Sequence, residues 1–265
     1  MKSTRGTSSL ATGQGELMPL ALTGIRPSQP QGQHIKLVGE VGGSVYYCKS
    51  ALNGKDVCAN EWIYSSLARH VGIPVPDFCP IIDYRTGETL FGSKETWGTA
   101  DEFEVQTLLT TPPNADPVIG DPFAWLGSYL SQVYAFDVFA GNVDRHLRNF
   151  LLIPGSPARR LLAYDFASSQ LIHRASDHFP IAQTRTQLVG RQLRKLRKFD
   201  IESAIEILER IRAVPISQIA SFLSSIPDEW ITEDQRGQVY EQWSGDVVTE
   251  RVKALISGLR DGSLL

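Results

Sequence analysis

The sequence has few cysteines, no long apolar run and little net charge. Its three cysteines, Cys48, Cys58 and Cys79, form no C-x-x-C pair, which excludes a disulfide framework and a cysteine-rich zinc site. No stretch approaches eighteen apolar residues, so we expect no membrane-spanning helix. The 26 Lys and Arg residues against 29 Asp and Glu residues argue against a nucleic-acid coat or a polybasic membrane binder.

Two further absences concern metals and targeting. The five histidines show no H-x-x-x-H spacing, so no catalytic zinc site is expected. No long apolar stretch follows Lys2 and Arg5, so we expect no secretory signal. Together these features predict a cytoplasmic protein in a reducing compartment, with no membrane association and no direct nucleic-acid partner.

The composition that is present divides the 265 residues into three parts. Residues 1–33 are rich in Ser, Thr, Gly, Gln and Pro, which predicts a flexible tail. A Pro-, Asn-, Asp- and Gly-rich break at 110–121 separates a predicted β-rich small lobe with its hinge, 34–115, from a predicted helical lobe, 116–265. This pattern predicts an α+β fold with two lobes.

The smaller part is predicted to be mostly β. Two β-branched and aromatic runs around a glycine turn, between residues 35 and 49, predict a hairpin. Asp56 is the predicted N-cap of a helix that ends at Gly72. Short apolar runs within 78–107 predict further strands.

The larger part is predicted to be helical. The Asp-Pro pair at 121–122 predicts the start of a long buried helix. Residues 200–213 and 215–226 have amphipathic spacing. Thr232 begins a capping-box sequence that predicts one helix running toward Leu259.

Residues 141–152 carry the most chemical information. Asp144 and Asn149 have the D-x-x-x-x-N spacing of a kinase catalytic loop, and a second apolar strand ends at Asp165-Phe166. In phosphoryl transfer one carboxylate orients the attacking hydroxyl, while an amide and a second carboxylate hold Mg²⁺ on the phosphates. We therefore predict that Asp144 is catalytic and that Asn149 and Asp165 bind the metal, at neighbouring strand ends.

Groups that bind phosphates precede this loop in the order that a kinase needs. The backbone N–H groups of Gly42 and Gly43 are free to approach phosphate oxygens. Lys49 ends the following strand and is predicted to reach the α- and β-phosphates of ATP. Glu61, on the next helix, is predicted to pair with Lys49.

Several segments resemble the HipA-like kinase family. Residues 142–150, N-V-D-R-H-L-R-N-F, resemble its N-x-D-x-H-x-K/R-N-F signature. Residues 60–69 resemble its N-E-x-x-x-x-x-L-A segment, and residues 72–76 resemble the G-I-P-V-P turn that follows. Residues 226–230 resemble a C-terminal signature of the smaller HipA-like domains.

The resemblance implies a bilobed, protein-kinase-like fold that uses ATP and Mg²⁺. The family includes Ser/Thr kinases of bacterial toxin–antitoxin modules, which implies a protein substrate and an antitoxin-like or regulatory partner. It gives Lys49 and the Gly42-Gly43-Ser44 loop a role in binding the nucleotide. It also assigns the catalytic and metal roles to the same residues as the spacing does.

Two alternatives remain open at this point. Residues 144–149 also resemble the D-R-H-x-x-N loop of phosphatidylinositol 3/4-kinases, although D-F-A stands at 165–167 where those enzymes have D-F-G. A small-molecule or lipid kinase of the same fold is therefore one alternative, and a pseudokinase that acts as a binding module is the other.

A basic run lies beyond the Asp165 segment. Residues 185–198 contain six Arg and Lys residues and no acidic residue. We interpret this run as a solvated helix face, with a basic groove for an acidic or phosphorylated partner as the alternative.

Overall fold

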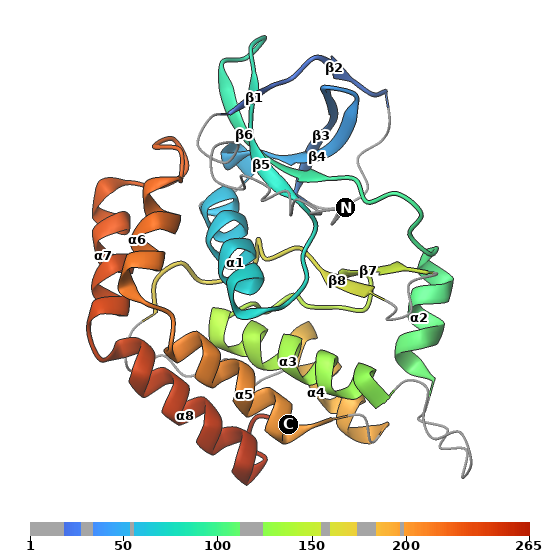
Figure 1. Ribbon diagram of the computed structural model, residues 1–265, viewed down its shortest axis with the longest axis vertical. Coiled ribbons are helices and arrows are strands. Elements are labelled where there is room, and N and C mark those ends of the chain that lie inside the picture. The colour runs from blue at the N-terminus through green and yellow to red at the C-terminus, as the bar shows by residue number, and fades with distance from the viewer. Residues whose placement is uncertain are drawn as a thin grey trace, which may run out of the picture.

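The computed structural model describes residues 19–27, 34–53, 56–111, 124–154, 160–173, 184–196 and 199–265. Figure 1 shows a β-sheet at one end of the molecule and a group of helices at the other. Helix α1 (Val57–Val71) and the two-stranded ribbon of β7 (Phe150–Ile153) and β8 (Arg160–Ala163) lie between them.

Among the described residues, the sheet at the first end has six strands in the order β1-β5-β6-β4-β3-β2. Their bounds are Leu20–Ala21 (β1), Gly24–Ile25 (β2), Ile35–Val41 (β3), Ser44–Lys49 (β4), Phe78–Asp83 (β5) and Glu88–Lys94 (β6). Strand β1 runs parallel to β5, and the other neighbours are antiparallel. The predicted tail, residues 1–33, therefore contains two short strands of this sheet in its described part.

The predicted hairpin is confirmed as β3 and β4. Gly42 and Gly43 form its turn with φ of 54° and 80°, a left-handed conformation that glycine adopts without a Cβ clash. Val41 pairs with Ser44 at the turn, and the register then carries Lys49 to the far end of β4. A short 3₁₀ turn, η1 (Ala51–Asn53), follows the strand.

Helix α1 begins and ends where the sequence predicts, but the predicted cap at its start is wrong. Asp56 has a φ of 66° and makes no side-chain bond to the first turn. Its Oδ1 instead accepts a hydrogen bond of 2.8 Å from Nε2 of Gln235, which ties the helix start to α7. Gly72 ends the helix with a φ of 95°.

The prediction of strands throughout 78–107 is only partly right. Strands β5 and β6 form, but α2 (Glu102–Thr110) is a helix. Asp101 accepts from the backbone N–H of Glu104, whose side chain accepts from the backbone N–H of Asp101. This capping box satisfies two end groups of the first turn, and it outweighs the β tendency of the apolar residues that follow.

In the described part of the chain, six helices form the other end of the molecule. They are α3 (Ala124–Ala140), α4 (Arg185–Lys195), α5 (Ile201–Arg212), α6 (Ile216–Ser224), α7 (Glu233–Ser244) and α8 (Val247–Asp261). The predicted helices at 200–213 and 215–226 are confirmed as α5 and α6. The predicted start of α3 at 121–122 lies outside the described residues.

The capping box at Thr232 is present, but the single helix predicted after it is wrong. Thr232 and Gln235 cap each other's backbone groups at the start of α7. The helix stops at Ser244 because Gly245 takes an extended conformation, and α8 then begins at Val247. Two helices, α7 and α8, therefore replace the single predicted helix. The break between them lets α8 pack against α5.

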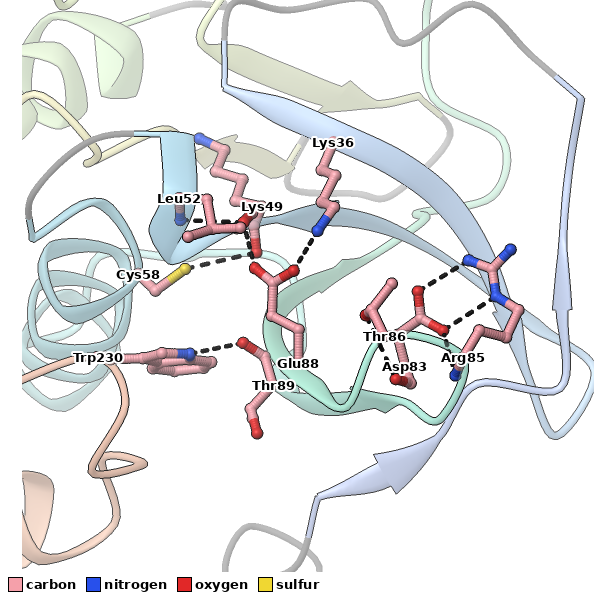
Figure 2. A network of polar contacts seen from close by, with 11 residues as sticks. Lys36, Lys49, Leu52, Cys58, Asp83, Arg85, Thr86, Glu88, Thr89 and Trp230 are labelled. Atoms are coloured by element: carbon pink, nitrogen blue, oxygen red, sulfur yellow. Dashed lines mark hydrogen bonds and ion pairs between the residues drawn. The ribbon is translucent and has the colours of Figure 1, made fainter.

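One hydrophobic core joins the two ends of the molecule. Trp62 of α1 lies edge-on to Phe78 of β5 at 5.2 Å and to Trp230 at 6.1 Å. Nε1 of Trp230 donates to the carbonyl of Thr89 in β6 at 2.8 Å (Figure 2). Among the described residues no helix is long and apolar enough to cross a membrane.

Candidate active site

Contacts with α1 and β6 fix the end of β4, and the Lys49 side chain extends from it toward Glu61 and Asp165. The Sγ of Cys58 donates to the carbonyl of Lys49 at 3.4 Å, and Ser50 and Lys36 both contact the carboxylate of Glu88. Figure 2 shows the Lys49 ammonium directed away from Glu88. The backbone is thereby anchored in the sheet while the charged end reaches the space between sheet and helices.

Lys49 joins two carboxylates from distant parts of the chain. Its Nζ lies 2.5 Å from Oε1 of Glu61 on α1 and 2.7 Å from Oδ1 of Asp165 after β8. The predicted Lys49–Glu61 pair is therefore present. We call these three residues the lysine cluster.

Burial and charge act in opposite directions in the lysine cluster. Burial alone would lower the pKa of Lys49, but the charges of Glu61 and Asp165 outweigh it and raise that pKa. Burial raises the pKa of Glu61, and Lys49 only partly offsets this. The lysine is thus fully charged at neutral pH and holds the two carboxylates together.

Asp165 adopts an unusual backbone conformation. Its φ is 67°, in the left-handed region that costs a residue with a Cβ about 1 kcal/mol. Burial tends to raise the pKa of Asp165, but the ammonium of Lys49 outweighs burial and lowers it to about 2. With 30% of its side chain exposed, Asp165 is an ionised carboxylate open to solvent at neutral pH.

Asn149 and Asp165 come from neighbouring strand ends, as predicted. Phe150 pairs with Ala163 across β7 and β8, and the backbone N–H of Tyr164 donates to the carbonyl of Asn149 at 3.2 Å. The donor set is a carboxylate and an amide, both hard oxygen ligands. This set fits Mg²⁺, which keeps several waters and needs few protein ligands.

Asp144 lies beside a residue that the sequence left as a surface position. Its Oδ1 is 2.9 Å from Nη1 of Arg185, the first residue of α4. Its backbone N–H donates to Oδ1 of Asn142 at 3.2 Å. The side chain is 33% exposed, so the carboxylate faces the solvent side of the site.

A second group of charged residues, which the sequence analysis missed, supports the loop that carries Asp144. The side chains of Arg145 and Asp137 are almost completely buried, with exposed fractions of 1% and 0%. The guanidinium donates twice to the carboxylate, at 2.7 and 2.9 Å, and Nδ2 of Asn142 donates to it at 2.8 Å. Asp137 is the only charged residue of α3, which was the available signal. We call these three residues the arginine cluster.

The arginine cluster bonds to the start of β7 and to the end of β8. Nη1 of Arg145 donates to the carbonyl of Asn149 at 3.2 Å and to the carbonyl of Tyr164. Its backbone N–H donates to Oγ1 of Thr186 at 2.9 Å, and that hydroxyl donates to the carbonyl of Asn142 at 2.6 Å. One guanidinium therefore sets the spacing of the loop ends, and Thr186 joins α4 to the same loop.

The glycine turn lies apart from the lysine cluster. Strand β4 separates Ser44 from Lys49, a span of about 17 Å at 3.3 Å per residue. A Cβ added to Gly42 or Gly43 would meet no atom within 4 Å, so the tip of the turn is open. The structure thus brings Lys49, Glu61 and Asp165 together but leaves the predicted phosphate loop at a distance.

Solved structures similar to this chain include a kinase. Helicobacter pylori proinflammatory kinase CtkA is 13% identical, with a TM-score of 0.59 over 94% of this chain and 100% of that one. HipA of Shewanella oneidensis, solved with HipB and operator DNA, is 15% identical, with a TM-score of 0.48 over 97% of this chain and 70% of that one. No curated protein sequence matches this chain.

One comparison shows the fold, and another shows the family. The similarity to CtkA confirms the predicted bilobed, kinase-like α+β fold. The sequence profile of the HipA-like kinases matches residues 39–257, which is most of the chain. This protein therefore belongs to the HipA-like kinase family.

Proposed function

We propose that this protein is an ATP- and Mg²⁺-dependent kinase that transfers the γ-phosphoryl group to a Ser or Thr hydroxyl of a protein. The observation that carries the proposal is the lysine cluster. An ammonium held at 2.5 and 2.7 Å from two carboxylates is a fixed cation with one exposed anionic neighbour. Such a site suits a phosphate chain that arrives with a divalent cation.

Two residues act on the reacting groups in this proposal. Lys49 binds and orients the α- and β-phosphates, while Glu61 holds the ammonium in place. Asp144 orients the acceptor hydroxyl and takes its proton as the oxygen bonds to the γ-phosphorus and the bond to ADP breaks.

The remaining predicted residues bind the metal and cover the nucleotide. Asn149 and Asp165 would hold Mg²⁺, which supplies positive charge to the phosphate oxygens when bound. The turn of Gly42, Gly43 and Ser44 would close over the phosphates through its backbone N–H groups. The toxin–antitoxin members of the family support a protein substrate and a regulatory protein partner.

A transfer assay tests the proposed function. Wild type and the variants Asp144→Asn and Asp165→Asn are incubated with γ-labelled ATP, Mg²⁺ and cell extract. We expect wild type to label proteins and both variants to lose on the order of 10³-fold in rate. Asp246→Asn, an exposed aspartate that makes no capping bond, is the matched control and should retain activity.

Other outcomes would contradict the proposal in different ways. Full labelling by Asp144→Asn would remove that residue from catalysis. Label found only in small molecules or lipids would indicate another acceptor class. A thermal shift with Mg²⁺-ATP but no transfer would indicate a pseudokinase.

A further inference from the structure

The exposed face of α4 carries an unusual line of side chains. Arg185, Leu188, Arg191 and Lys195 recur at near-helical spacing, and all four are exposed. The opposite face is buried through residues such as Val189 and Leu193 and packs against α3. We call the four exposed residues the basic stripe.

The basic stripe starts at the site of the proposed chemistry. Arg185 forms the 2.9 Å ion pair with Asp144, and its neighbour Thr186 is hydrogen-bonded to the loop that carries Asp144. The start of α4 is therefore fixed relative to the catalytic loop. The stripe leads away from that point for ten residues, or about 15 Å at 1.5 Å per residue.

The charges farther along the stripe have no partner among the described residues. Arg191 and Lys195 form no ion pair there, in contrast with surface cations such as Lys253, which lies 2.8 Å from Glu250. No acidic residue occurs in 185–198 to neutralise them. A length of about 15 Å matches four or five residues of extended peptide.

We propose that the basic stripe binds an acidic segment of the protein acceptor and leads its Ser or Thr to Asp144; this inference rests on the proposed function. An acidic side chain of the acceptor pairs with Arg185 in place of Asp144. The carboxylate of Asp144 is then released to accept a hydrogen bond from the acceptor hydroxyl. Leu188, 53% exposed between the cations, supplies an apolar contact.

An acidic peptide fits the stripe better than a nucleic acid does. The stripe has no aromatic side chain on which bases stack. An extended acidic segment only has to exchange one carboxylate for another at Arg185.

A peptide assay with charge reversal tests the proposal. Three serine peptides, with acidic, neutral or basic flanks, are compared for kcat/KM and for binding by fluorescence anisotropy. We expect the acidic peptide to be preferred at least tenfold. The double variant R191E/K195E should raise the KM for that peptide about tenfold, while the KM for ATP serves as the internal reference.

The control and the salt dependence separate this effect from general charge. K253E on α8 also reverses an exposed cation, and it should leave the KM for the acidic peptide unchanged. Higher salt should raise that KM in wild type more than in R191E/K195E, because screening weakens only the charges that are present.

The two proposals fail in distinguishable ways. If wild type labels extract proteins but does not prefer the acidic peptide, or K253E weakens its binding as much as R191E/K195E does, the docking proposal is wrong and the proposed function stands. Tighter binding of a single-stranded oligonucleotide than of the acidic peptide would also overturn the docking proposal. If wild type transfers no phosphate, the proposed function fails, and anisotropy still reports on the stripe.

Discussion

The lysine cluster and the arginine cluster are both groups of buried charged residues, yet they differ in how far solvent reaches their carboxylates. Asp165 of the lysine cluster is 30% exposed, and its three residues come from β4, α1 and the segment after β8. The arginine cluster is sealed at 1% and 0% exposure, and its carboxylate is bonded from three directions. The first arrangement can exchange a partner for a ligand, whereas the second can only hold the loop in shape.

The largest expected effect concerns the sealed cluster. Asp137→Ala leaves the Arg145 guanidinium buried without its counter-charge, which costs about 3–5 kcal/mol. Urea unfolding should show this loss. Asp137→Asn keeps an acceptor and should lose less. A loss below about 1 kcal/mol in the alanine variant would contradict the contrast between the clusters.

The open cluster should tolerate the equivalent change better. Lys49→Met leaves Glu61 buried without a cation, and we expect a loss of about 1–3 kcal/mol at pH 8. The raised pKa of Glu61 means that its unfavourable charge is removed as pH falls through that pKa, so the loss should shrink on acidification. Unfolding at pH 8 and pH 5.5 measures this change. In the double variant K49M/E61Q the loss relative to wild type should no longer shrink on acidification.

A buried histidine gives a third test, because its charged neighbour, Arg251, has the same sign as the protonated ring. Burial lowers the pKa of His173 from 6.5 to about 3. Because this pKa is lowered, the contribution of neutral His173 to the free energy of unfolding is fully present above pH 6.5. It is lost as pH falls toward 3, by about 1.4 kcal/mol for each pH unit. Unfolding at pH 7, 6 and 5 should show this slope in wild type. A persistent slope in His173→Gln would assign it to other groups.

The smallest effect should come from the edge of the sealed cluster. Thr186→Val removes the hydroxyl that joins Arg145 and Asn142, and we expect a loss of about 1 kcal/mol. Thr186→Ser restores both hydrogen bonds and should recover the loss. Equal melting temperatures for valine and wild type would show that this hydroxyl does not stabilise the loop.

The elements that the sequence predicted correctly are those with local signals. The glycine turn of β3–β4, the Gly72 stop of α1 and the Thr232 capping box each lie within a few residues of their consequence. The N-cap predicted at Asp56 was wrong because its carboxylate accepts a hydrogen bond from Gln235, 179 residues away. Helix α2 was missed because its capping box at Asp101 was not weighed against the β tendency of its apolar residues.

The candidate site was predictable in composition but not in its contacts. Lys49, Glu61 and Asp165 were identified from their order along the chain, and the structure brings them together. The contact of Arg185 with Asp144 spans 41 positions and depends on where α4 starts, which no local pattern fixes. Their roles in catalysis remain predictions.

The contacts of α1 have a consequence for synthesis. Nε1 of Trp62 donates to the carbonyl of Phe222 at 3.3 Å and to Oγ of Ser225 at 3.2 Å, and Asp56 accepts from Gln235. The helix that carries Glu61 is thus clasped by residues 160 to 179 positions later. While residues 222–235 are still inside the ribosome, α1 lacks these hydrogen-bond partners. The contacts that hold α1 are therefore complete only after residues 222–235 have left the ribosome, so that a nascent chain ending before them lacks this support for the lysine cluster.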